Sequence, residues 1–551
     1  MDKIFGIDLG TTYSCIAYVD EYDKAVVVQN FENERTTPSV VYFEDDGSNI
    51  VGQEAKNMLK SEPEKVITFI KRSMGDPNFF FNHNGIQYTP EEISSRVLMK
   101  LVQDASANVG FEIKDVVITC PAYFGINERE ATKKAGEIAG LNVKSIINEP
   151  TAAALAYGIE QVQDQTVLVY DLGGGTFDIT MIEVKPQSIE VVVTGGDHNL
   201  GGKNWDDALM LYCADKFSEE IGVSDDILSD EETKGDLQIS VESAKKTLST
   251  RSDTKIRVIH GTNKVNIEIS REKFDELTKD LTEKTIMLTN QMLDEAKAKG
   301  YTSFDKILLV GGSTRMPQIK EILEQYYPSV PVEFFDPDES VAKGAAVYGQ
   351  QLAVNGEIIK RIAEKTGKNE DEIDITRVDE TVLNQVQADV ADQIGFTLGA
   401  VKKATEQVLS NVASKSFGIE AITKEGELKV INLIMKQSTI PAEITKVFGT
   451  NVANQENIEV TVYENEMSDY EVDICMSTEI GKGVIDGLPP GLQQGSPVQV
   501  TFKINNEGRL EINAMELTGN CGLNLAIETT SVIGGDALEA AKARSKAIKL
   551  S

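Results

Sequence analysis

Residues 166–184 read TVLVYDLGGGTFDITMIEV, and residues 3–19 read KIFGIDLGTTYSCIAYV. Each stretch consists of an apolar run, the step Asp-Leu-Gly, a turn of small residues ending in threonine, and a second apolar run. Two β-type runs joined by a short glycine turn predict a β-hairpin. One such turn alone would indicate no more than a plain hairpin. Because the phrase occurs twice with an acid at each tip, we expect the tips to face each other and to hold a polyphosphate with its metal ion.

The composition limits the class of protein. The length of 551 residues corresponds to about three or four domains, and a hydrophobic content of 41% is enough for globular cores. A net charge of −34 argues against affinity for nucleic acid or an anionic membrane, which need a surplus of Lys and Arg. The simplest interpretation of the charge is a solvated acidic surface.

Cysteine usage and the N-terminus bear on the compartment. Five widely spaced cysteines without a CxxC pair favour a reducing compartment. Cys15 and Cys120 lie in apolar runs, where we expect buried thiols. The chain enters a strand at once, without the basic and apolar regions of a signal peptide, and no apolar run reaches the ~18–20 residues that span a membrane. The sequence therefore predicts a soluble, cytoplasmic protein.

Four segments of the chain differ in their pattern. Residues 1–353 alternate between strand-like and helix-like runs, which predicts an α/β domain with two lobes, one for each hairpin. Residues 354–407 predict a helical insert or connector, with a short helix EIIKRIAEKT stopped by Gly367. Residues 408–530 alternate in short runs between turn signals and predict an antiparallel β-sandwich. Residues 531–551 predict one short helix over 536–548. Four aliphatic residues of the insert are spaced four apart and share a helical face: Val382, Val386, Val390 and Ile394.

Residues at the hairpin tips have the chemistry of phosphate and metal binding. The backbone N–H groups of the loop Gly173-Gly174-Gly175-Thr176 can approach a phosphate closely. The loop is neither a dinucleotide fingerprint nor a P-loop, since GxGxxG and GK[ST] are both absent. Asp8 and Asp171 are suited to hold a hydrated magnesium ion. The hydroxyls of Thr11, Thr12 and Thr176 would bind phosphate oxygens.

Two further stretches fit a nucleotide. VGGSTRMP (310–317) follows a strand and precedes a helix, so its glycines and the helix N-terminus can approach an anion or a nucleoside edge. In SVESAKKTLS (240–249), helical spacing places Glu242, Lys245, Lys246 and Ser249 on nearly one face. On spacing alone, a solvated amphipathic helix explains this second pattern more simply.

Taken together, these phrases resemble the seventy-kilodalton heat-shock protein family of ATP-dependent chaperones. The resemblance covers nearly the whole chain outside 356–407. In the first part the matching stretches are GIDLGTTYS (6–14), RTTPSVV (35–41), IKR (70–72), VVITCPAYF (116–124), INEPTAAALAYG (147–158), YDLGGGTFDI (170–179), HNLGG (198–202), LVGGSTRMP (309–317) and DPDESVAKGAAV (336–347). Those that resemble the family's substrate domain are FGIEA (417–421), STIPAE (438–443) and VTFKINNEGRLEI (500–512).

For the fold, the resemblance implies an α/β, actin-like ATPase domain of two lobes, then an antiparallel β-sandwich substrate domain and a short C-terminal helix. By the family's pattern Lys71 reaches the γ-phosphate and positions the attacking water, although the residues alone would make it an ordinary surface lysine. The implied catalytic set is Lys71, Glu149, Asp171, Thr176 and Asp178. The implied magnesium set is Asp8, Glu149 and Asp171, with potassium as a further cation.

The resemblance also implies a site for ATP and ADP. Lys246 stands where the family usually has arginine, and an ammonium stacks on adenine less well than a guanidinium does. We therefore expect a lower nucleotide affinity. The implied nucleotide positions are Gly10, Thr11, Thr12, Tyr13, Gly173, Gly174, Gly175, Gly201, Gly202, Glu242, Lys245, Lys246, Ser249, Gly311, Gly312, Ser313, Arg315 and Asp338.

Further matches concern the substrate and its coupling to the nucleotide. An extended apolar segment of an unfolded polypeptide would bind the sandwich by strand addition, and Pro121 and Arg129 match a pair that couples the nucleotide state to substrate release. Ile422 and Asn451 match an arch over the peptide. Without the resemblance, the aliphatic pocket residues would be assigned to the sandwich core. The matching pocket positions are Ile419, Phe448, Ile458 and Val460.

The chain departs from the family at three places. The stretch VLSNV (408–412) replaces a leucine-rich linker ended by Asp, so either residues 356–407 take over the linker's role or coupling is altered. Gly125, Ile126 and Ser145 replace residues that receive a J-domain partner, which puts that partner in doubt, whereas a nucleotide-exchange factor stays allowed. About fifteen residues after position 535 stand in place of the family's helical lid, and we expect fast peptide exchange.

Three functions are compatible with these features. The leading hypothesis is an ATP-driven chaperone in which ATP hydrolysis controls the affinity for peptide. The alternative is a nucleotide-dependent holdase or co-chaperone with weak coupling between ATP and peptide, favoured by the altered linker and the missing lid. An actin-like filament or a sugar kinase would share the hairpins, but the β-rich half argues against both.

Overall fold

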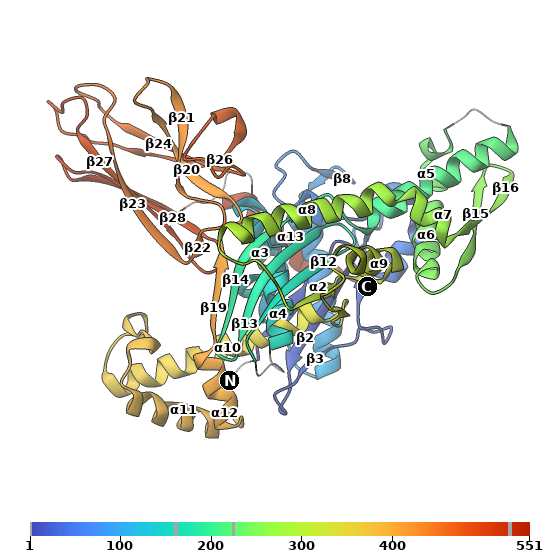
Figure 1. Cartoon of the computed structure of the whole chain (residues 1–551), viewed down its shortest axis with the longest axis horizontal. Helices are drawn as coiled ribbons and strands as arrows, with labels where there is room; N and C mark the ends of the chain where they lie inside the picture. The colour runs from blue at the N-terminus through green and yellow to red at the C-terminus, as the bar shows by residue number, and fades with distance from the viewer. Residues whose placement is uncertain (1–2, 159–162, 223–225, 527–531) are drawn as a thin grey trace.

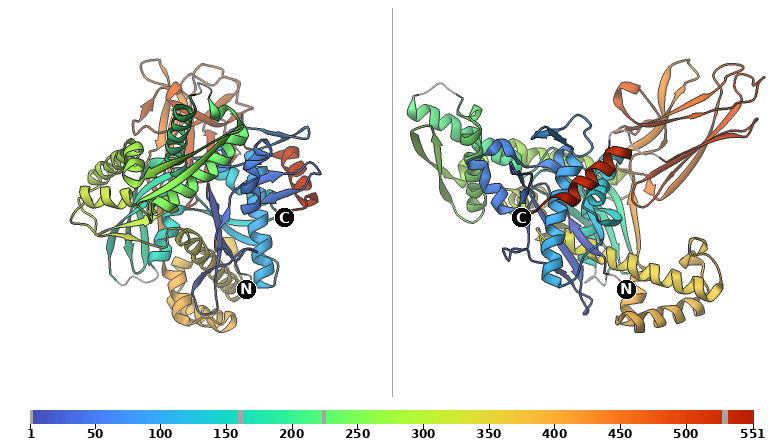
Figure 2. Two further views of the ribbon diagram at one scale, coloured as in Figure 1. Left: turned by 90° about the vertical axis from the view of Figure 1, so that its right-hand side faces the viewer. Right: turned by 180° about the vertical axis from the view of Figure 1, so that it is seen from behind.

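The computed structural model describes residues 3–158, 163–222, 226–526 and 532–551. Figure 1 shows a central body of sheets and helices, a β-rich part at its upper left, and a small group of helices (yellow and orange) at its lower left, with β19 running between the two. Figure 2 shows the same parts from the side and from behind, with the C-terminal helix (red) lying against the central body. The start of the chain at residues 1–2 and the expected boundary at 530/531 lie outside the described residues.

The first half of the central body is built on a sheet with the strand order β11-β10-β1-β2-β3, and β4 pairs with β2. β1 and β2 form an antiparallel hairpin that places Asp8 opposite Cys15, so the first predicted hairpin is confirmed. β10 and β11 add in parallel beside β1. The bounds are β1 (Phe5–Asp8), β2 (Tyr13–Val19), β3 (Ala25–Val27), β4 (Thr37–Pro38), β10 (Asp115–Cys120) and β11 (Asn142–Asn148).

The second half repeats this order as β18-β17-β12-β13-β14, and its sheet continues into β19 and β22. β12 and β13 form the second predicted hairpin, with Asp171 opposite Asp178, and β17 and β18 add in parallel beside β12. The two sheets share strand order and direction, which explains why the hairpin phrase occurs twice. The bounds are β12 (Gln165–Leu172), β13 (Phe177–Lys185), β14 (Ser188–Asp197), β17 (Lys306–Val310) and β18 (Val332–Phe334).

Two helices in contact with each other join the sheets: α4 (Glu149–Gly158) packs on the second sheet and α10 (Ser340–Thr366) on the first. Small residues allow the close approach, since a Cβ on Gly344 would overlap the backbone of Ala152. Ala152 and Ala345 are buried in one apolar cluster with Val117 of the first sheet and Leu308 of the second. The relative position of the two sheets therefore depends on this helix pair.

α10 is longer than the sequence predicted. The expected short helix EIIKRIAEKT is the last part of this 27-residue helix, which runs across the expected boundary at 353/354. Gly349 and Gly356 lie inside the helix without ending it, because packing of the buried face outweighs the propensity cost of about 1 kcal/mol for a glycine. Gly367 ends the helix as predicted, in a left-handed conformation with φ 69°.

Beyond Gly367, α11 (Glu380–Ile394) and α12 (Leu398–Glu406) pack against the last part of α10. We call residues 354–407 the three-helix module. Helices are observed here as predicted, and Val386 and Val390 are fully buried while Val382 and Ile394 are partly buried. Because α10 contributes one of the helices, the module is anchored in the central body. Its apolar cluster is Val354, Ile358, Ile362, Val386, Val390, Ala391, Val401 and Ala404.

The β-rich part contains the predicted antiparallel pairing. One sheet has the order β25-β21-β20-β24-β26 and the other β23-β27-β28-β29, and both contribute side chains to one apolar cluster that includes Phe417, Val462, Phe502 and Ile512. The bounds are β19 (Val408–Val412), β20 (Ser416–Ile422), β21 (Leu428–Ile434), β22 (Thr439–Ile440), β23 (Ala442–Gly449), β24 (Ile458–Asn465), β25 (Glu471–Val472), β26 (Ser477–Ile485), β27 (Pro497–Ile504), β28 (Leu510–Glu516) and β29 (Cys521–Ala526).

The last helix, α13 (Gly535–Ala547), begins and ends one residue earlier than predicted. It packs on α2 (Pro90–Val109) and α3 (Ile126–Ile138) of the central body. Arg544 donates two hydrogen bonds to the buried Glu92, at 2.6 and 3.1 Å. Ser551 exchanges backbone hydrogen bonds with β6 (Asn49–Val51). The C-terminal segment is therefore fastened to the central body.

Smaller elements complete the central body. Cys15 and Cys120 are buried free thiols, as predicted. Across the described ranges, no helix is both long and apolar enough to cross a bilayer. The remaining elements are α1 (Gln53–Asn57), β5 (Val41–Phe43), β7 (Val66–Ile67), β8 (Phe81–His83), β9 (Ile86–Tyr88), α5 (Gly202–Ile221), α6 (Glu231–Leu248), β15 (Asp253–His260), β16 (Asn263–Ser270), α7 (Arg271–Leu277), α8 (Lys279–Ala298) and α9 (Pro317–Tyr326).

Candidate active site

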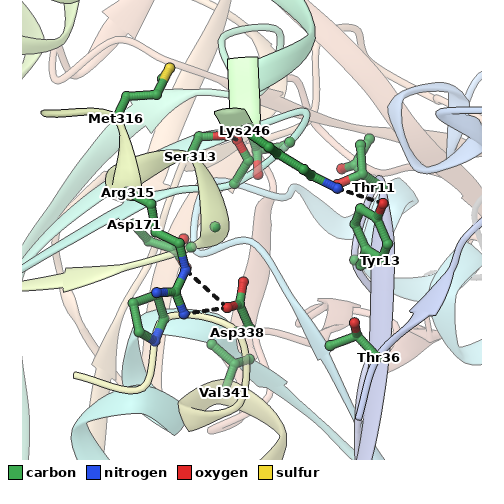
Figure 3. A pocket seen from close by; sticks show the side chains of 18 of the residues that line it. Thr11, Tyr13, Thr36, Asp171, Lys246, Ser313, Arg315, Met316, Asp338 and Val341 are labelled. Carbon is green, nitrogen blue, oxygen red and sulfur yellow. Dashed lines mark hydrogen bonds and ion pairs between the residues drawn. The ribbon is translucent and has the colours of Figure 1, made fainter. Parts of the chain in front are cut away.

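A cavity of about 620 Å³ lies between the two sheets at the tips of the two hairpins (Figure 3). The tips are in direct contact, because a Cβ on Gly174 would overlap Thr12 and a Cβ on Gly175 would overlap Thr11. The arrangement agrees with the prediction that the two phrases face each other. Only glycine in the second tip allows this approach.

Backbone hydrogen bonds fix the glycine loop of the second tip. The N–H of Gly173 donates to the carbonyl of Thr176 at 3.0 Å. The N–H groups of Gly202 and Lys203 donate to the carbonyls of Gly173 and Gly174 at 3.0 and 2.8 Å. The loop and the start of α5 are thus held in one conformation, which reduces the ordering that a bound phosphate would require.

Arg72 was not predicted as a site residue, yet it holds the same loop. Its guanidinium donates to the carbonyl of Gly175 at 2.7 and 3.0 Å and to Oδ1 of Asn204 at 2.9 Å. These bonds connect the 3₁₀ helix Ile70–Ser73 of the first half to the second hairpin. The signal in the sequence was the match IKR (70–72), of which only Lys71 was used.

Four carboxylates surround one lysine at the base of the cavity. Asp8 ends β1, Asp171 and Asp178 lie opposite each other on β12 and β13, and Glu149 begins α4. The Nζ of Lys71 lies 2.5 Å from Oε1 of Glu149. Each acid therefore comes from the end of a regular element, which gives the group a fixed geometry.

Burial and mutual repulsion shift the pKa values of these acids. Burial and then the carboxylate of Glu149 raise the pKa of Asp8 to about 7, and the same two causes raise the pKa of Asp178 to about 7. Burial and Glu149 also raise the pKa of Asp171 well above its usual value. Burial lowers the pKa of Lys71, but Glu149 and Asp8 outweigh it and the net shift is upward. Lys71 is therefore cationic, and the raised pKa values of the acids show that this one cation does not fully offset their burial and mutual repulsion.

The chemistry of this group fits a hydrated magnesium ion. A further cation would stabilise the ionised forms of these acids and lower their raised pKa values, and oxygen ligands are those that magnesium takes. Among the described residues, no three His, Cys, Asp or Glu side chains converge closely enough to enclose a bare metal ion. Magnesium usually keeps several waters and does not need such a cage.

Lys71 is not the ordinary surface lysine that its residue context suggested. It is 5% exposed and follows Phe69, whose left-handed backbone (φ 57°) turns the chain into the 3₁₀ helix. Burial of this cation depends on Glu149, which is far away in the sequence. A local pattern could not show the pairing.

The opposite end of the cavity is lined by α6 and the first hairpin. Tyr13 donates to Glu242 at 3.0 Å, and the ammonium groups of Lys56 and Lys246 bind both of these residues. Burial would raise the pKa of Glu242, but Lys56 and Lys246 lower it to about 2. Lys56 was not predicted as a site residue, because it lies in none of the motifs quoted from the sequence. This cluster connects the two halves of the central body across the mouth of the cavity.

A second group of predicted residues lies beside α6. Lys245 donates to the carbonyl of Gly202 at 3.0 Å and pairs with Asp206 at 2.6 Å. Arg315 pairs with Asp338 at 2.6 Å at the rim (Figure 3). Asp206 was not predicted as a site residue. It lies one helical turn beyond Gly202, so its position after the Gly201-Gly202 pair was the feature of the sequence that could have indicated it.

The structure brings the predicted nucleotide and metal residues into one place. Four predicted residues lie just behind the cavity wall. Asp178 lies opposite Asp171, Gly175 lies against Thr11, Gly201 lies against Gly175, and Gly202 donates to the carbonyl of Gly173. The predicted residues that line the cavity directly are Asp8, Gly10, Thr11, Thr12, Tyr13, Lys71, Glu149, Asp171, Gly173, Gly174, Thr176, Glu242, Lys245, Lys246, Ser249, Gly311, Gly312, Ser313, Arg315 and Asp338. Sequence reasoning missed the other lining residues, Thr36, Asp206, Thr250, Met316, Phe334, Pro337 and Val341.

The two residues expected to couple nucleotide and substrate lie at the junction with the sandwich. Pro121 is buried at the end of β10. Arg129 donates to Asn148 at 2.5 Å and to the carbonyl of Glu507, in the sandwich, at 3.4 Å. Arg129 therefore contacts both parts of the molecule.

Ile126 and Gly125 also contribute to this junction. Ile126 is 6% exposed and belongs to the apolar cluster of the sandwich. A Cβ on Gly125 would lie 2.8 Å from both carboxylate oxygens of Glu464, which pairs with Lys415 at 2.9 Å. These positions depart from the family pattern, and in this chain the sandwich covers them.

The six residues matched to the peptide site differ in exposure. Ile419 and Val460 are 5% and 4% exposed within the sandwich cluster, and Phe448 and Ile458 are partly buried against it. Ile422 and Asn451 are exposed. The first four share one apolar cluster, in which Ile419 and Val460 are core members while Phe448 and Ile458 keep part of their surface accessible.

The geometry defines a class of protein: a body of two repeated sheets, with a cavity suited to phosphate and metal between them, joined to a β-sandwich. A family model described as Hsp70 protein matches residues 4–80, 76–363 and 357–549. The chain is 36% identical over 534 residues to the chaperone protein DnaK of Halobacterium salinarum, in strains R1 and NRC-1, covering 96% of this chain and 75% of the relative. The chain belongs to the Hsp70 family. It is an ATP-dependent chaperone and an ATPase, and the holdase alternative is not favoured.

The single tryptophan of the chain gives a direct readout of the loop. Trp205 is fully buried in the first turn of α5, next to the Gly201-Gly202 step. We expect its fluorescence to change when ATP or ADP binds, because bound phosphates alter the packing of this turn. Titration with nucleotide tests this, and Trp205→Phe gives the background. An emission spectrum unaffected by saturating ATP would contradict the placement of the phosphates.

Proposed function

We propose that ATP binds with its phosphates between the hairpin tips and its nucleoside between α6 and the segment 310–317. The contact of the two tips above a buried carboxylate group is the observation that carries this proposal. In domain terms, residues 1–353 form an actin-like, two-lobed ATPase domain and 354–407 a helical connector. Residues 408–530 form the peptide-binding sandwich with its entry strand β19, whose first residues pair with β14 of the ATPase sheet, and 531–551 form a vestigial lid helix.

In this proposal, Asp8, Glu149 and Asp171 hold hydrated magnesium. When bound, magnesium neutralises charge on the β- and γ-phosphates. The hydroxyls of Thr11, Thr12 and Thr176 and the N–H groups of the glycine loop orient the phosphate oxygens. Because little covalent work is left to the protein in phosphoryl transfer, positioning and electrostatics account for most of the rate.

Lys71 and Asp178 are assigned to the attacking water. The ammonium of Lys71, held by Glu149, binds the γ-phosphate and the water, and thereby fixes the direction of attack. Asp178 has a pKa of about 7 and can take up a proton from the water near neutral pH. An acid with a raised pKa that accepts the proton, beside a fixed ammonium that orients the water, suits hydrolysis.

At the nucleoside end, Lys246 and Arg315 face the cavity from opposite sides (Figure 3). Lys246 is engaged with Tyr13 and Glu242, so a base that stacks on it must compete with these contacts. This competition supports the expectation of a lower nucleotide affinity than arginine would give.

On the substrate side, we propose that extended apolar segments of unfolded polypeptides bind at Ile419, Phe448, Ile458 and Val460, bordered by Ile422 and Asn451. Support comes from the single apolar cluster that these residues share, at which Phe448 and Ile458 are only partly buried. A nucleotide-exchange factor remains a proposed partner. Ile126 and Gly125 are covered by the sandwich, which argues against a standard J-domain contact there.

The coupling of ATP to peptide is tested by release kinetics. We expect ATP to accelerate dissociation of a fluorescent apolar peptide about tenfold or more relative to ADP, equivalent to about 1.4 kcal/mol of differential binding. Stopped-flow anisotropy measures the rate, and Arg129→Ala should reduce the acceleration while peptide binding in ADP persists. Equal release rates in ATP and ADP, with the ATPase intact, would favour a holdase.

A further inference from the structure

The strand β19 connects the ATPase sheet to the sandwich. It pairs in parallel with β14 at Val408, Leu409 and Ser410, and then antiparallel with β22 at Asn411 and Val412. One continuous sheet therefore runs from the centre of the ATPase domain into the substrate domain (Figure 1).

On its own, the pairing of β19 with β14 is weak. It consists of three residue pairs at a sheet edge, and Val408 is 59% exposed. Leu409 is partly buried against the cluster that contains Ile189. Short strand pairs of this size are marginal in water unless something else holds the strands together.

The three-helix module is connected to β19 by a single residue. α12 ends at Glu406, and only Gln407 separates it from β19. Gln407 accepts a hydrogen bond from Gln351 of α10 at 2.6 Å, and the N–H of Val408 donates to the carbonyl of Gln187 at 2.9 Å. The connection from α12 to β19 thus contains no flexible linker.

The module is itself tied to the ATPase domain. Its cluster joins Ile358 of α10 to Val390 of α11 and Val401 of α12, and α10 is the same helix that packs on α4 and the first sheet. A strand tethered at such short range to its own binding edge has a very high effective concentration there. Its dissociation requires the module to unfold or to swing away as a body.

We propose that the three-helix module is a rigid brace that keeps β19 in the edge of the ATPase sheet whichever nucleotide is bound. The nucleotide then acts on the sandwich by moving the whole sheet, not by releasing β19. The effect on the sandwich rests on the proposed coupling between ATP and peptide. The position of β19 does not, and it is tested separately by the protection of the β19 amides from hydrogen exchange.

Hydrogen exchange with mass spectrometry on the full chain tests the brace. We expect the amides of 408–412 to be protected equally, within about threefold, with ATP, with ADP and without nucleotide. Exchange that is about tenfold faster in ADP or without nucleotide than in ATP would overturn the proposal. ATPase and peptide-release rates on the same sample report the proposed function separately, so failure of one is distinguishable from failure of the other.

A matched pair of insertions isolates the role of the tether. A six-residue Gly/Ser insertion between Glu406 and Gln407 introduces slack, and we expect it to accelerate exchange of 408–412 about tenfold or more. The same insertion after Lys368, in the exposed turn beyond α10, leaves the connection to β19 intact and should not change that exchange. Unchanged protection after the first insertion would show that the brace is not what holds β19.

Discussion

The variant Lys71→Ala is expected to lose ATP hydrolysis by about 100-fold or more, the size of effect seen when a pre-organised charge is removed from a transition state. Lys71 is buried and pairs with Glu149 at 2.5 Å, while the guanidinium of the adjacent Arg72 is held by the carbonyl of Gly175. Single-turnover hydrolysis of ATP measures the loss. Nucleotide binding should persist, because the glycine loop and the α6 cluster do not depend on Lys71.

The control for this variant is Lys365→Ala, which removes a lysine that pairs with Asp389 at the surface of the three-helix module. Its hydrolysis rate should equal that of the wild type. The melting temperature of Lys71→Ala must be measured as well, since the four acids would lose the ammonium that pairs with Glu149. Hydrolysis at the wild-type rate by a folded Lys71→Ala would remove Lys71 from the mechanism.

The variant Gly344→Ala is expected to be the most damaging change to stability that a single methyl group can make here. The new Cβ would overlap the backbone of Ala152 where α10 and α4 cross. Backbone atoms cannot rotate away as a side chain can, so the helices must move apart. We expect a loss of about 3 kcal/mol, the upper range for overpacking, seen as a lower melting temperature of the ATPase domain by calorimetry.

The same helix supplies the matched control. Gly356 also lies inside α10, but a Cβ there meets no atom within 4 Å. Gly356→Ala should therefore raise the stability by about 0.5–1 kcal/mol, because alanine favours the helix over glycine. If both variants shifted the melting temperature in the same direction, the close contact at Gly344 would not be what positions α10.

The sequence was most informative where structure is local. Both hairpins could be predicted because apolar runs and glycine turns act within about twenty residues. The stop at Gly367 was predictable for the same reason: a left-handed residue ends a helix wherever it stands. Most residues of the candidate site were named from family motifs, and the structure places them around one cavity.

The sequence was less informative where long-range contacts decide. Burial of Lys71 depends on Glu149, and the role of Arg72 depends on a carbonyl of Gly175 more than 100 positions away. The length of α10 follows from packing between sheets, which outweighs its glycines. The stretch 408–412 is only five residues long, and its strand conformation depends on pairing with β14, which is more than 200 positions away in the sequence.

The position of Ile126 has a consequence for temperature. This side chain from the ATPase domain lies in the apolar cluster of the sandwich, so separating the two domains would expose apolar surface to water. Such exposure carries a positive heat-capacity change, and the corresponding attraction weakens on cooling. The association of the domains is therefore expected to be weaker in the cold than at higher temperature. The contact made by Ile126 would in this way make the association of the two domains sensitive to temperature.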